Sequence, residues 1–217
     1  MKKLILTFAA LILIAAPALA DTVTIADSWG GTNGGEFIVT PSGFGFTPAS
    51  LGEQTTPQFE TFCVETAEFL NFGSTFTVSS ITGKAIMGRT PPGDPISNET
   101  AWLYDQFISR TLAYQYDTST QANRNQRISD ANDLQNAIWA YEGEGGGPTK
   151  YTVLANAAVN PPGGGGWVNP GTIKVMNLTW SDGTRAQDLL VKVPAPAAVL
   201  LGVVGLALVG WARKRIR

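Results

Sequence analysis

The sequence contains no histidine and only one cysteine. Histidine is the commonest general base and metal ligand in enzymes, so its absence excludes a histidine-dependent catalytic triad, a zinc-peptidase site and c-type haem ligation. The single cysteine, Cys63, excludes an intramolecular disulfide. Because no strong carboxylate or calcium-binding motif stands out either, we expect no metal, no cofactor and no enzymatic activity. Cys63 itself is a buried inert residue, an intermolecular bridge or a reactive group.

The N-terminus has the three parts of a secretory signal peptide. Two lysines follow Met1, an apolar run extends from Leu4 to Ala16, and Ala18 and Ala20 form an Ala-x-Ala cleavage site. We expect residues 1–20 to form a signal helix that signal peptidase removes. The mature chain would then begin at Asp21.

The C-terminus is typical of a membrane stop. The proline-broken segment Val193-Pro194-Ala195-Pro196 leads into an apolar run at about 197–212, which predicts a transmembrane helix near the short limit for a span. A basic tail follows, as expected for a positive-inside end. Its residues are Arg213, Lys214, Arg215 and Arg217. An ordinary single-span anchor is one explanation of residues 193–217.

This tail also closely resembles the PEP-CTERM sorting signal of exported bacterial proteins, in which a short Pro-x-Pro motif precedes a membrane helix and a basic end. That family usually has Val-Pro-Glu-Pro, and Ala195 stands at the acidic position. The resemblance implies that an exosortase-like membrane protease cuts near the motif. The protein would first be anchored in the membrane, with its ectodomain outside the cytoplasm, and would then reach the cell surface or the extracellular space.

Between these ends, residues 21–192 predict a single ectodomain that is clearly acidic. The ends contain six of the 15 Lys and Arg residues, which leaves nine basic residues against all 17 Asp and Glu. A net charge of about −8 argues against nucleic acid or an anionic polymer as the partner.

The ectodomain predicts a β-rich α+β fold, namely a β-sandwich or a barrel-like sheet with a helical insertion at about 98–142. Four-residue spacing of apolar side chains predicts a helix at 98–112 and another at 130–141, with Ser97 and Ser129 as N-caps. The polar stretch 115–126 reads as a connection, and 152–158 is ambiguous. Strands are expected at 22–25, 36–40, 59–64, 75–79, 172–180 and 187–193.

Two short motifs could carry chemistry. Phe62-Cys63-Val64-Glu65 and Leu134-Gln135-Asn136-Ala137-Ile138-Trp139 resemble the paired motifs of Cys–Gln thioester domains in bacterial surface adhesins. The resemblance implies that the Cys63 thiol attacks the Gln135 side chain and expels ammonia, with Phe62 and Trp139 shielding the bond. Leu134 stands where that family often has threonine. Equally, Cys63 is typical of a small buried hydrophobe and Gln135 of an ordinary helix former.

Segments of the middle of the chain also resemble an ectodomain type that recurs among PEP-CTERM proteins, although this resemblance implies no particular activity. The matching segments are 63–65, 100–107 and 134–144.

We expect an exported surface or matrix protein, possessing a thioester that couples it to an amine or hydroxyl on a surface. The alternative is a passive structural or carbohydrate-binding module for exopolysaccharide, in which exposed Trp29, Trp167 and Trp180 contact the polymer. A hydrolase that uses Glu65 with Glu68, or Glu142 with Glu144, comes third.

Overall fold

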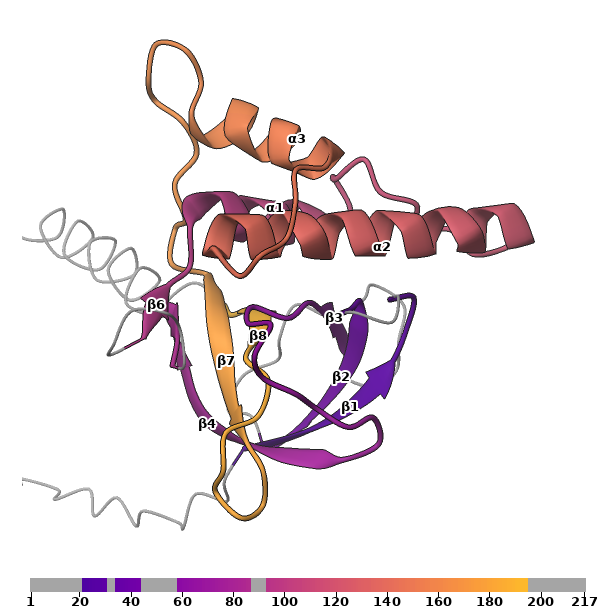
Figure 1. Ribbon diagram of the computed structural model, residues 1–217, viewed down its shortest axis with the longest axis vertical. Coiled ribbons are helices and arrows are strands. Elements are labelled where there is room, and N and C mark those ends of the chain that lie inside the picture. Colours follow the sequence, from indigo (N-terminus) through magenta and orange to yellow (C-terminus); the bar gives the residue numbers. More distant parts are fainter. Residues whose placement is uncertain (1–20, 31–33, 44–57, 87–92, 195–217) are drawn as a thin grey trace, which may run out of the picture.

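The computed structural model describes residues 21–30, 34–43, 58–86 and 93–194 (Figure 1). The predicted signal peptide with Ala18 and Ala20, the predicted transmembrane helix at 197–212, and the sorting and basic residues from Ala195 onward lie outside these ranges. Within the described ranges, no helix is both long enough and apolar enough to cross a membrane.

A six-stranded antiparallel sheet forms the body of the protein. Its strand order is β3-β2-β1-β4-β7-β8. Side chains alternate along the strands, so that Val23 and Ile25 of β1 and Phe37 and Val39 of β2 are buried on one face. The strands are β1 (Thr22–Asp27), β2 (Phe37–Ser42), β3 (Phe59–Thr61), β4 (Thr75–Thr82), β7 (Ile173–Thr179) and β8 (Leu189–Lys192), and a separate small hairpin comprises β5 (Lys84–Ala85) and β6 (Asp94–Pro95).

The two edges of the sheet meet just after β3. Cys63 pairs with Leu189 in an isolated bridge, and the N–H of Val64 donates to the Asp188 carbonyl at 3.0 Å. On the other side of this bridge, the N–H of Leu190 donates to the Phe62 carbonyl at 3.2 Å. The sheet therefore curls until its edge strands pair, which encloses an apolar interior and leaves little exposed edge.

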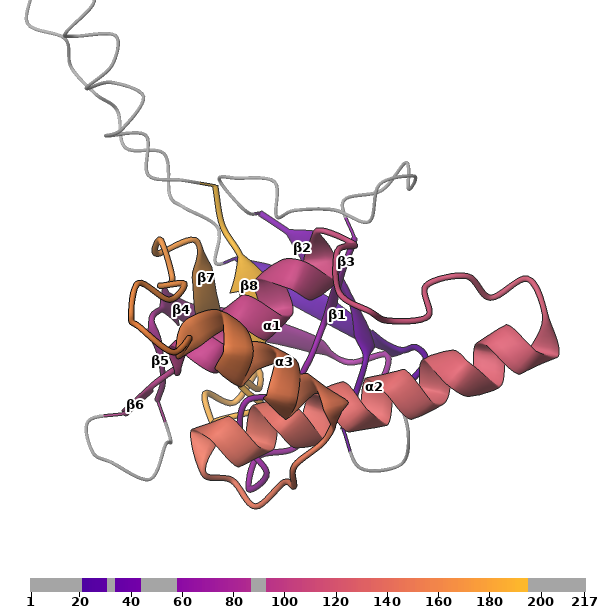
Figure 2. The same ribbon diagram turned by 90° about the horizontal axis from the view of Figure 1, so that it is seen from above.

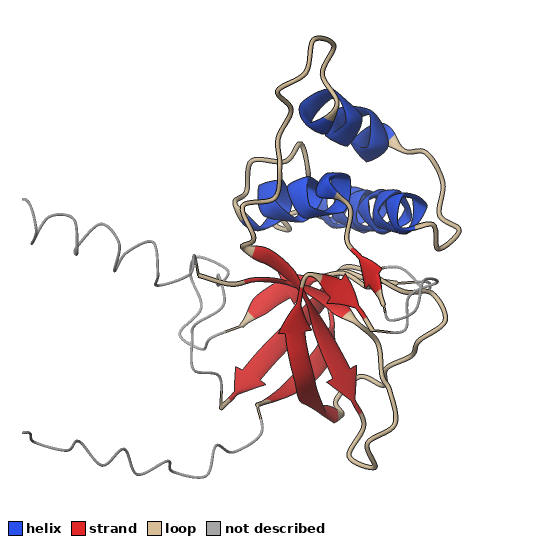
Figure 3. Cartoon of the chain, turned by 90° about the vertical axis from the view of Figure 1, so that its left-hand side faces the viewer, coloured by secondary structure: helices blue, strands red, loops and turns tan. Residues whose placement is uncertain are grey.

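Three helices cover one end of this curled sheet (Figure 3). They are α1 (Asn98–Ile108), α2 (Gln121–Glu142) and α3 (Lys150–Val159). A second apolar cluster lies between the helices and the sheet, where Phe107 of α1 and Ile138 of α2 join Leu190 of β8. The α+β class and the capping of α1 by Ser97 are thus confirmed, and the sheet is antiparallel.

The predicted start of α2 at Asp130 is wrong, because the helix begins at Gln121 and includes Ser129 as an interior residue. Thr120 is the N-cap, and its hydroxyl accepts the N–H of Asn123 at 3.1 Å. The first turns project beyond the sheet (Figure 2), and they are polar because they have almost nothing to pack against. Local capping, rather than an apolar stripe, defines this end of the helix.

The ambiguous segment 152–158 lies within α3, which begins with a capping box formed by Thr149 and Thr152. The hydroxyl of Thr149 accepts the N–H of Tyr151 at 3.2 Å, and the hydroxyl of Thr152 accepts the N–H of Thr149 at 3.1 Å. Only Tyr151 and Ala155 of this helix are buried, so its apolar periodicity is weak.

Candidate functional site at Cys63 and Gln135

Cys63 and Gln135 are 72 positions apart in the sequence, and the fold brings them into direct contact. The backbone N–H of Cys63 donates to Gln135 Oε1 at 3.0 Å, and Gln135 Nε2 donates to the Cys63 carbonyl at 2.9 Å. Both residues are buried. The side-chain amide of Gln135 therefore pairs with the backbone of Cys63 much as a neighbouring strand would.

A second backbone donor reaches the same oxygen of Gln135. The N–H of Gly35, which precedes β2, donates to Oε1 at 3.2 Å. Two N–H groups on one carbonyl oxygen withdraw charge from the carbonyl carbon and resemble an oxyanion hole. The amide of Gln135 is thus held in one orientation and polarised toward attack.

Gly34 gives this amide the room it occupies. A Cβ atom at Gly34 would lie 2.8 Å from Cγ of Gln135 and 2.6 Å from Cη2 of Trp139, and the φ angle of +116° disfavours any residue with a side chain. The loop before β2 therefore packs directly on the face of α2 that presents Gln135 and Trp139.

Trp139 and Phe62, the two predicted shielding residues, lie in different places. Trp139 lines a cavity next to Cys63, as expected one helical turn after Gln135. Phe62 instead packs beneath the helices, edge-on to Phe107 with ring centroids 5.0 Å apart, whereas Cys63 belongs to the interior of the curled sheet. Successive residues of an extended segment point to opposite faces, so Phe62 supports the segment from behind rather than covering the thiol.

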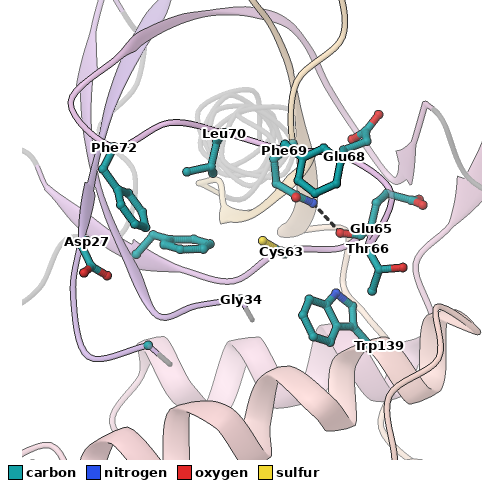
Figure 4. A pocket seen from close by; sticks show the side chains of 13 residues that line it. Asp27, Gly34, Cys63, Glu65, Thr66, Glu68, Phe69, Leu70, Phe72 and Trp139 are labelled. Carbon is teal, nitrogen blue, oxygen red and sulfur yellow. Dashed lines mark hydrogen bonds between the residues drawn. The ribbon is translucent and has the colours of Figure 1, made fainter. Parts of the chain in front are cut away.

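The cavity at Cys63 has a volume of about 780 Å³ and a mixed aromatic and acidic lining. Figure 4 shows Cys63 between Phe72 and Trp139, with Glu65 and Glu68 along the same wall. Phe69 and Phe72 are also solvent-exposed, at 75% and 52% of their surface. The described lining includes the carboxyl groups of Asp27, Glu65 and Glu68 but no lysine or arginine, so no basic side chain of this lining repels a neutral or cationic molecule.

Burial controls protonation around this cavity. It raises the pKa of the Cys63 thiol well above its ordinary value, and the charge of Glu68 raises it further. Burial, followed by the charge of Asp188, raises the pKa of Glu68 to about 8. The pKa of Glu65 rises to about 7 through burial and the nearby Glu144. Cys63 is therefore a neutral thiol near pH 7, and its attack on an amide requires a proton acceptor.

The two predicted carboxylate pairs serve different purposes. Glu142 accepts the N–H and the hydroxyl of Ser97 at 3.1 and 2.8 Å, which fixes the start of α1. Glu144 accepts the N–H and the hydroxyl of Thr66 at 3.2 and 2.9 Å, which fastens the segment after Cys63 to the end of α2. Glu65 and Glu68 both line the cavity. No group of described residues has the arrangement of a metal site.

A buried ion cluster near the site was not predicted from the sequence. Arg127 of α2 pairs with Glu36 and, at 2.6 Å, with Glu60 of β3, while Tyr114 donates to Glu36. Arg110 approaches the other oxygen of Glu60 at 3.3 Å. The cluster therefore links α2 to the loop before β2. Arg127 lies two turns before Gln135, and its partner Glu36 is next to Gly35. In the sequence, this cluster was indicated by Glu36 and Glu60, which are acidic residues within otherwise apolar expected strands.

The three tryptophans expected to be exposed are half-buried, so that expectation is wrong. Trp180 packs on Phe76 with ring centroids 4.6 Å apart, and Arg127 lies 5.6 Å from the Trp29 ring centroid. Trp167 packs against the cluster beneath the helices. Exposed aromatic surface lies instead at Phe69 and Phe72, beside the cavity.

Comparisons of the chain with protein-family models, with curated proteins and with solved structures find no match.

Proposed function

We propose that this is an exported surface or matrix protein whose ectodomain forms a Cys63–Gln135 thioester for covalent attachment to a partner. One observation carries the proposal. The amide of Gln135 is held by both backbone groups of Cys63, and its oxygen accepts two N–H donors. An ordinary buried glutamine needs hydrogen-bond partners, but it does not need them from the one cysteine of the chain.

The proposed chemistry makes use of these contacts. The sulfur of Cys63 attacks Cδ of Gln135, and the negative charge that develops on Oε1 is stabilised by the N–H groups of Cys63 and Gly35. The C–N bond then breaks, and the amide nitrogen leaves as ammonia. The product is an activated acyl group that turns over only once, when a nucleophile opens it and restores the thiol.

The attacking group would enter through the cavity beside Cys63. A primary amine or a hydroxyl group on a partner surface has the required reactivity, and the described lining contains no lysine or arginine that would repel an amine, which is cationic near neutral pH. Attack yields an amide or an ester at Gln135. This makes the protein an adhesive or cross-linking component rather than an enzyme.

Delivery would depend on the two ends of the chain. Signal peptidase would remove residues 1–20, and the predicted C-terminal helix would hold the protein in the membrane until an exosortase-like protease acts near the Val193–Pro196 motif. Val193 still belongs to the ectodomain, because its N–H donates to the Thr172 carbonyl at 2.8 Å. Pro194 is exposed immediately after it. The motif would therefore begin at a residue that is still hydrogen-bonded to the ectodomain.

The intact mass of the purified full chain tests the thioester. We expect a species lighter by one ammonia that gains one methylamine and exposes one thiol in the same reaction. Because Cys63 is buried, thiol labelling should be done in denaturant without added amine. The full mass together with one labelled thiol would contradict the proposal, and Cys63→Ala supplies the baseline for both readouts.

A passive exopolysaccharide-binding module is the alternative, and exposed Phe69 and Phe72 beside the cavity favour it. Pull-down on polymer beads followed by a denaturing wash separates the two functions. A thioester protein stays attached and loses attachment in Cys63→Ala, whereas a passive binder is washed off in both forms. Phe69→Ser with Phe72→Ser should abolish only the passive interaction.

A further inference from the structure

We propose that Arg127 is a positioning residue of the candidate site, because its guanidinium group holds in place the backbone segments whose N–H groups polarise the Gln135 amide. This inference rests on the proposed thioester, since it concerns how readily that amide is attacked. It adds to the proposal a residue of the buried ion cluster, which acts through its partners Glu36 and Glu60.

Arg127 reaches both of the segments that supply the N–H donors. Its Nε donates to Glu36 Oε2 at 3.2 Å, while its Nη2 donates to the other oxygen of Glu36 and, at 2.6 Å, to Glu60 Oε1. Glu36 directly follows the donor Gly35, and Glu60 lies in β3, three positions before the donor Cys63. One side chain of α2 therefore links the two donor segments.

The loop before β2 meets α2 at two successive residues. Gln135 accepts the N–H of Gly35, and Arg127, two turns earlier on the same helix, donates to Glu36. Arg127 grips both oxygens of Glu36, and such a bidentate pair fixes direction as well as distance. Gly35 is thus held between its own hydrogen bond and the ion pair of its neighbour.

The N–H of Gly35 should depend on this ion pair more than the N–H of Cys63 does. Cys63 exchanges two hydrogen bonds with Gln135 and is also held by its bridge to Leu189. The N–H of Gly35 reaches Gln135 Oε1 at 3.2 Å, the long end of the usual range for such a bond. A small displacement of Glu36 therefore weakens the Gly35 contact first.

The connection between α1 and α2 keeps the guanidinium in this orientation. Nη1 of Arg127 donates to the Tyr116 carbonyl at 2.8 Å, and the hydroxyl of Tyr114 donates to Glu36. A lysine at position 127 would retain the positive charge but would lose the bidentate grip, because its ammonium is a single point of charge on a flexible stem. Arg127→Lys therefore separates the geometry of the cluster from its charge.

Hydrogen exchange, resolved by NMR on the full chain, tests the placement of Gly35 directly. The measurement uses chains that also have Cys63→Ala, so that the Gln135 amide stays intact whatever the wild type does. We expect Arg127→Lys to speed exchange of the Gly35 N–H by about fivefold, the change that corresponds to one lost hydrogen bond, and that of the N–H at position 63 by less than about twofold. A merely destabilising change would speed both alike, through unfolding of the whole domain.

Lys150→Met is the matched control, because it removes another ion pair of α2, the 2.5 Å contact of Lys150 with Asp130. That pair joins α2 to the start of α3 and not to the loop before β2. We expect Lys150→Met to leave the exchange of the Gly35 N–H, relative to that at position 63, as it is in the parent chain.

The rate of thioester formation is the second measurement, in chains that retain Cys63. Each chain is refolded from denaturant, quenched at intervals and weighed for loss of ammonia, while tryptophan fluorescence follows folding. We expect Arg127→Lys to slow the loss of ammonia in the folded chain by about 10²-fold, the usual cost of a misplacement of about 1 Å, and Lys150→Met to keep the wild-type rate.

Equal acceleration of the two N–H groups in Arg127→Lys, or an unchanged rate of ammonia loss, overturns the inference. If Arg127→Lys does not fold, Glu36→Gln takes its place in both measurements, because it has nearly the same shape but lacks the charge that the guanidinium grips. Absence of thioester from the wild-type chain overturns the proposed function instead. The exchange of the Gly35 N–H still decides the positioning role in that case, so the two failures are distinguishable.

Discussion

Replacing Gly34 by alanine should destabilise the fold and prevent the proposed thioester in the same step. The added Cβ would lie 2.6 Å from Cη2 of Trp139 and 2.8 Å from Cγ of Gln135, closer than carbon atoms approach without displacement. The two side chains lie on a packed helix face, so they cannot both move away freely. Gln135 should shift and lose hydrogen bonds to Gly35 or Cys63.

The magnitude has two parts. A residue with a side chain at φ = +116° costs about 1–2 kcal/mol in backbone strain. Overpacking against Trp139 and Gln135 adds roughly 1–3 kcal/mol. We therefore expect Gly34→Ala to lower the free energy of unfolding by about 2–5 kcal/mol.

Gly163→Ala is a matched control, because Gly163 has a similar φ of +103° and nothing within 4 Å of its added Cβ. It should show the strain alone. Urea unfolding followed by tryptophan fluorescence gives both stabilities, and intact mass gives the thioester content. Equal stability losses in the two variants, with the thioester intact in Gly34→Ala, would refute the packing argument.

Three further outcomes follow from the same structure. Arg127→Met leaves Glu36 and Glu60 buried without their main cation, so urea unfolding should show a loss of about 3–5 kcal/mol, with a smaller loss for Arg127→Lys. Thr120→Ala removes the cap that accepts the Asn123 N–H and should cost about 1 kcal/mol, seen in the same assay and as reduced helical circular dichroism. Burial raises the pKa of Glu60 from 4.5 to about 7, so the folded state binds this proton more tightly than the unfolded state does. Its stabilisation is complete below pH 4.5 and is lost as the pH rises through 7, hence the thermal midpoint should fall between pH 5 and pH 8, and a flat or rising midpoint contradicts this assignment.

The strands and helix α1 were predictable because the pattern of neighbouring residues in each shows which side is buried. Val23 and Ile25 alternate with polar residues, and Ser97 precedes an apolar stripe, so neighbouring residues suffice. The first half of α2 has no such pattern of apolar residues. It projects beyond the sheet, and only the contact of Thr120 with Asn123 marks where it begins.

The candidate pair at Cys63 and Gln135 was identified by the resemblance of two short motifs and not by residue type alone, and its environment was not predicted. The second donor comes from Gly35, and the space for the amide comes from Gly34, and neither glycine was assigned a role in the site from the sequence. Nor was it predicted that the carboxylate of Glu68 is fastened by the N–H of Asp188, 120 positions away. Periodicity reports which face of an element is buried, but it contains no information on which distant backbone groups converge on one side chain.

The distance of 72 positions between Cys63 and Gln135 has a consequence for timing. The strand that leads to Cys63 emerges from the ribosome long before α2, and the N–H groups that polarise Gln135 are in place only after the sheet has curled and the helix has docked. In an extended chain that passes through a membrane pore, the thiol and the amide are not in contact and cannot react with each other. If the proposed thioester forms, it forms only when the tertiary structure is complete, so a chain exported in the unfolded state would become reactive only after it has folded at its destination.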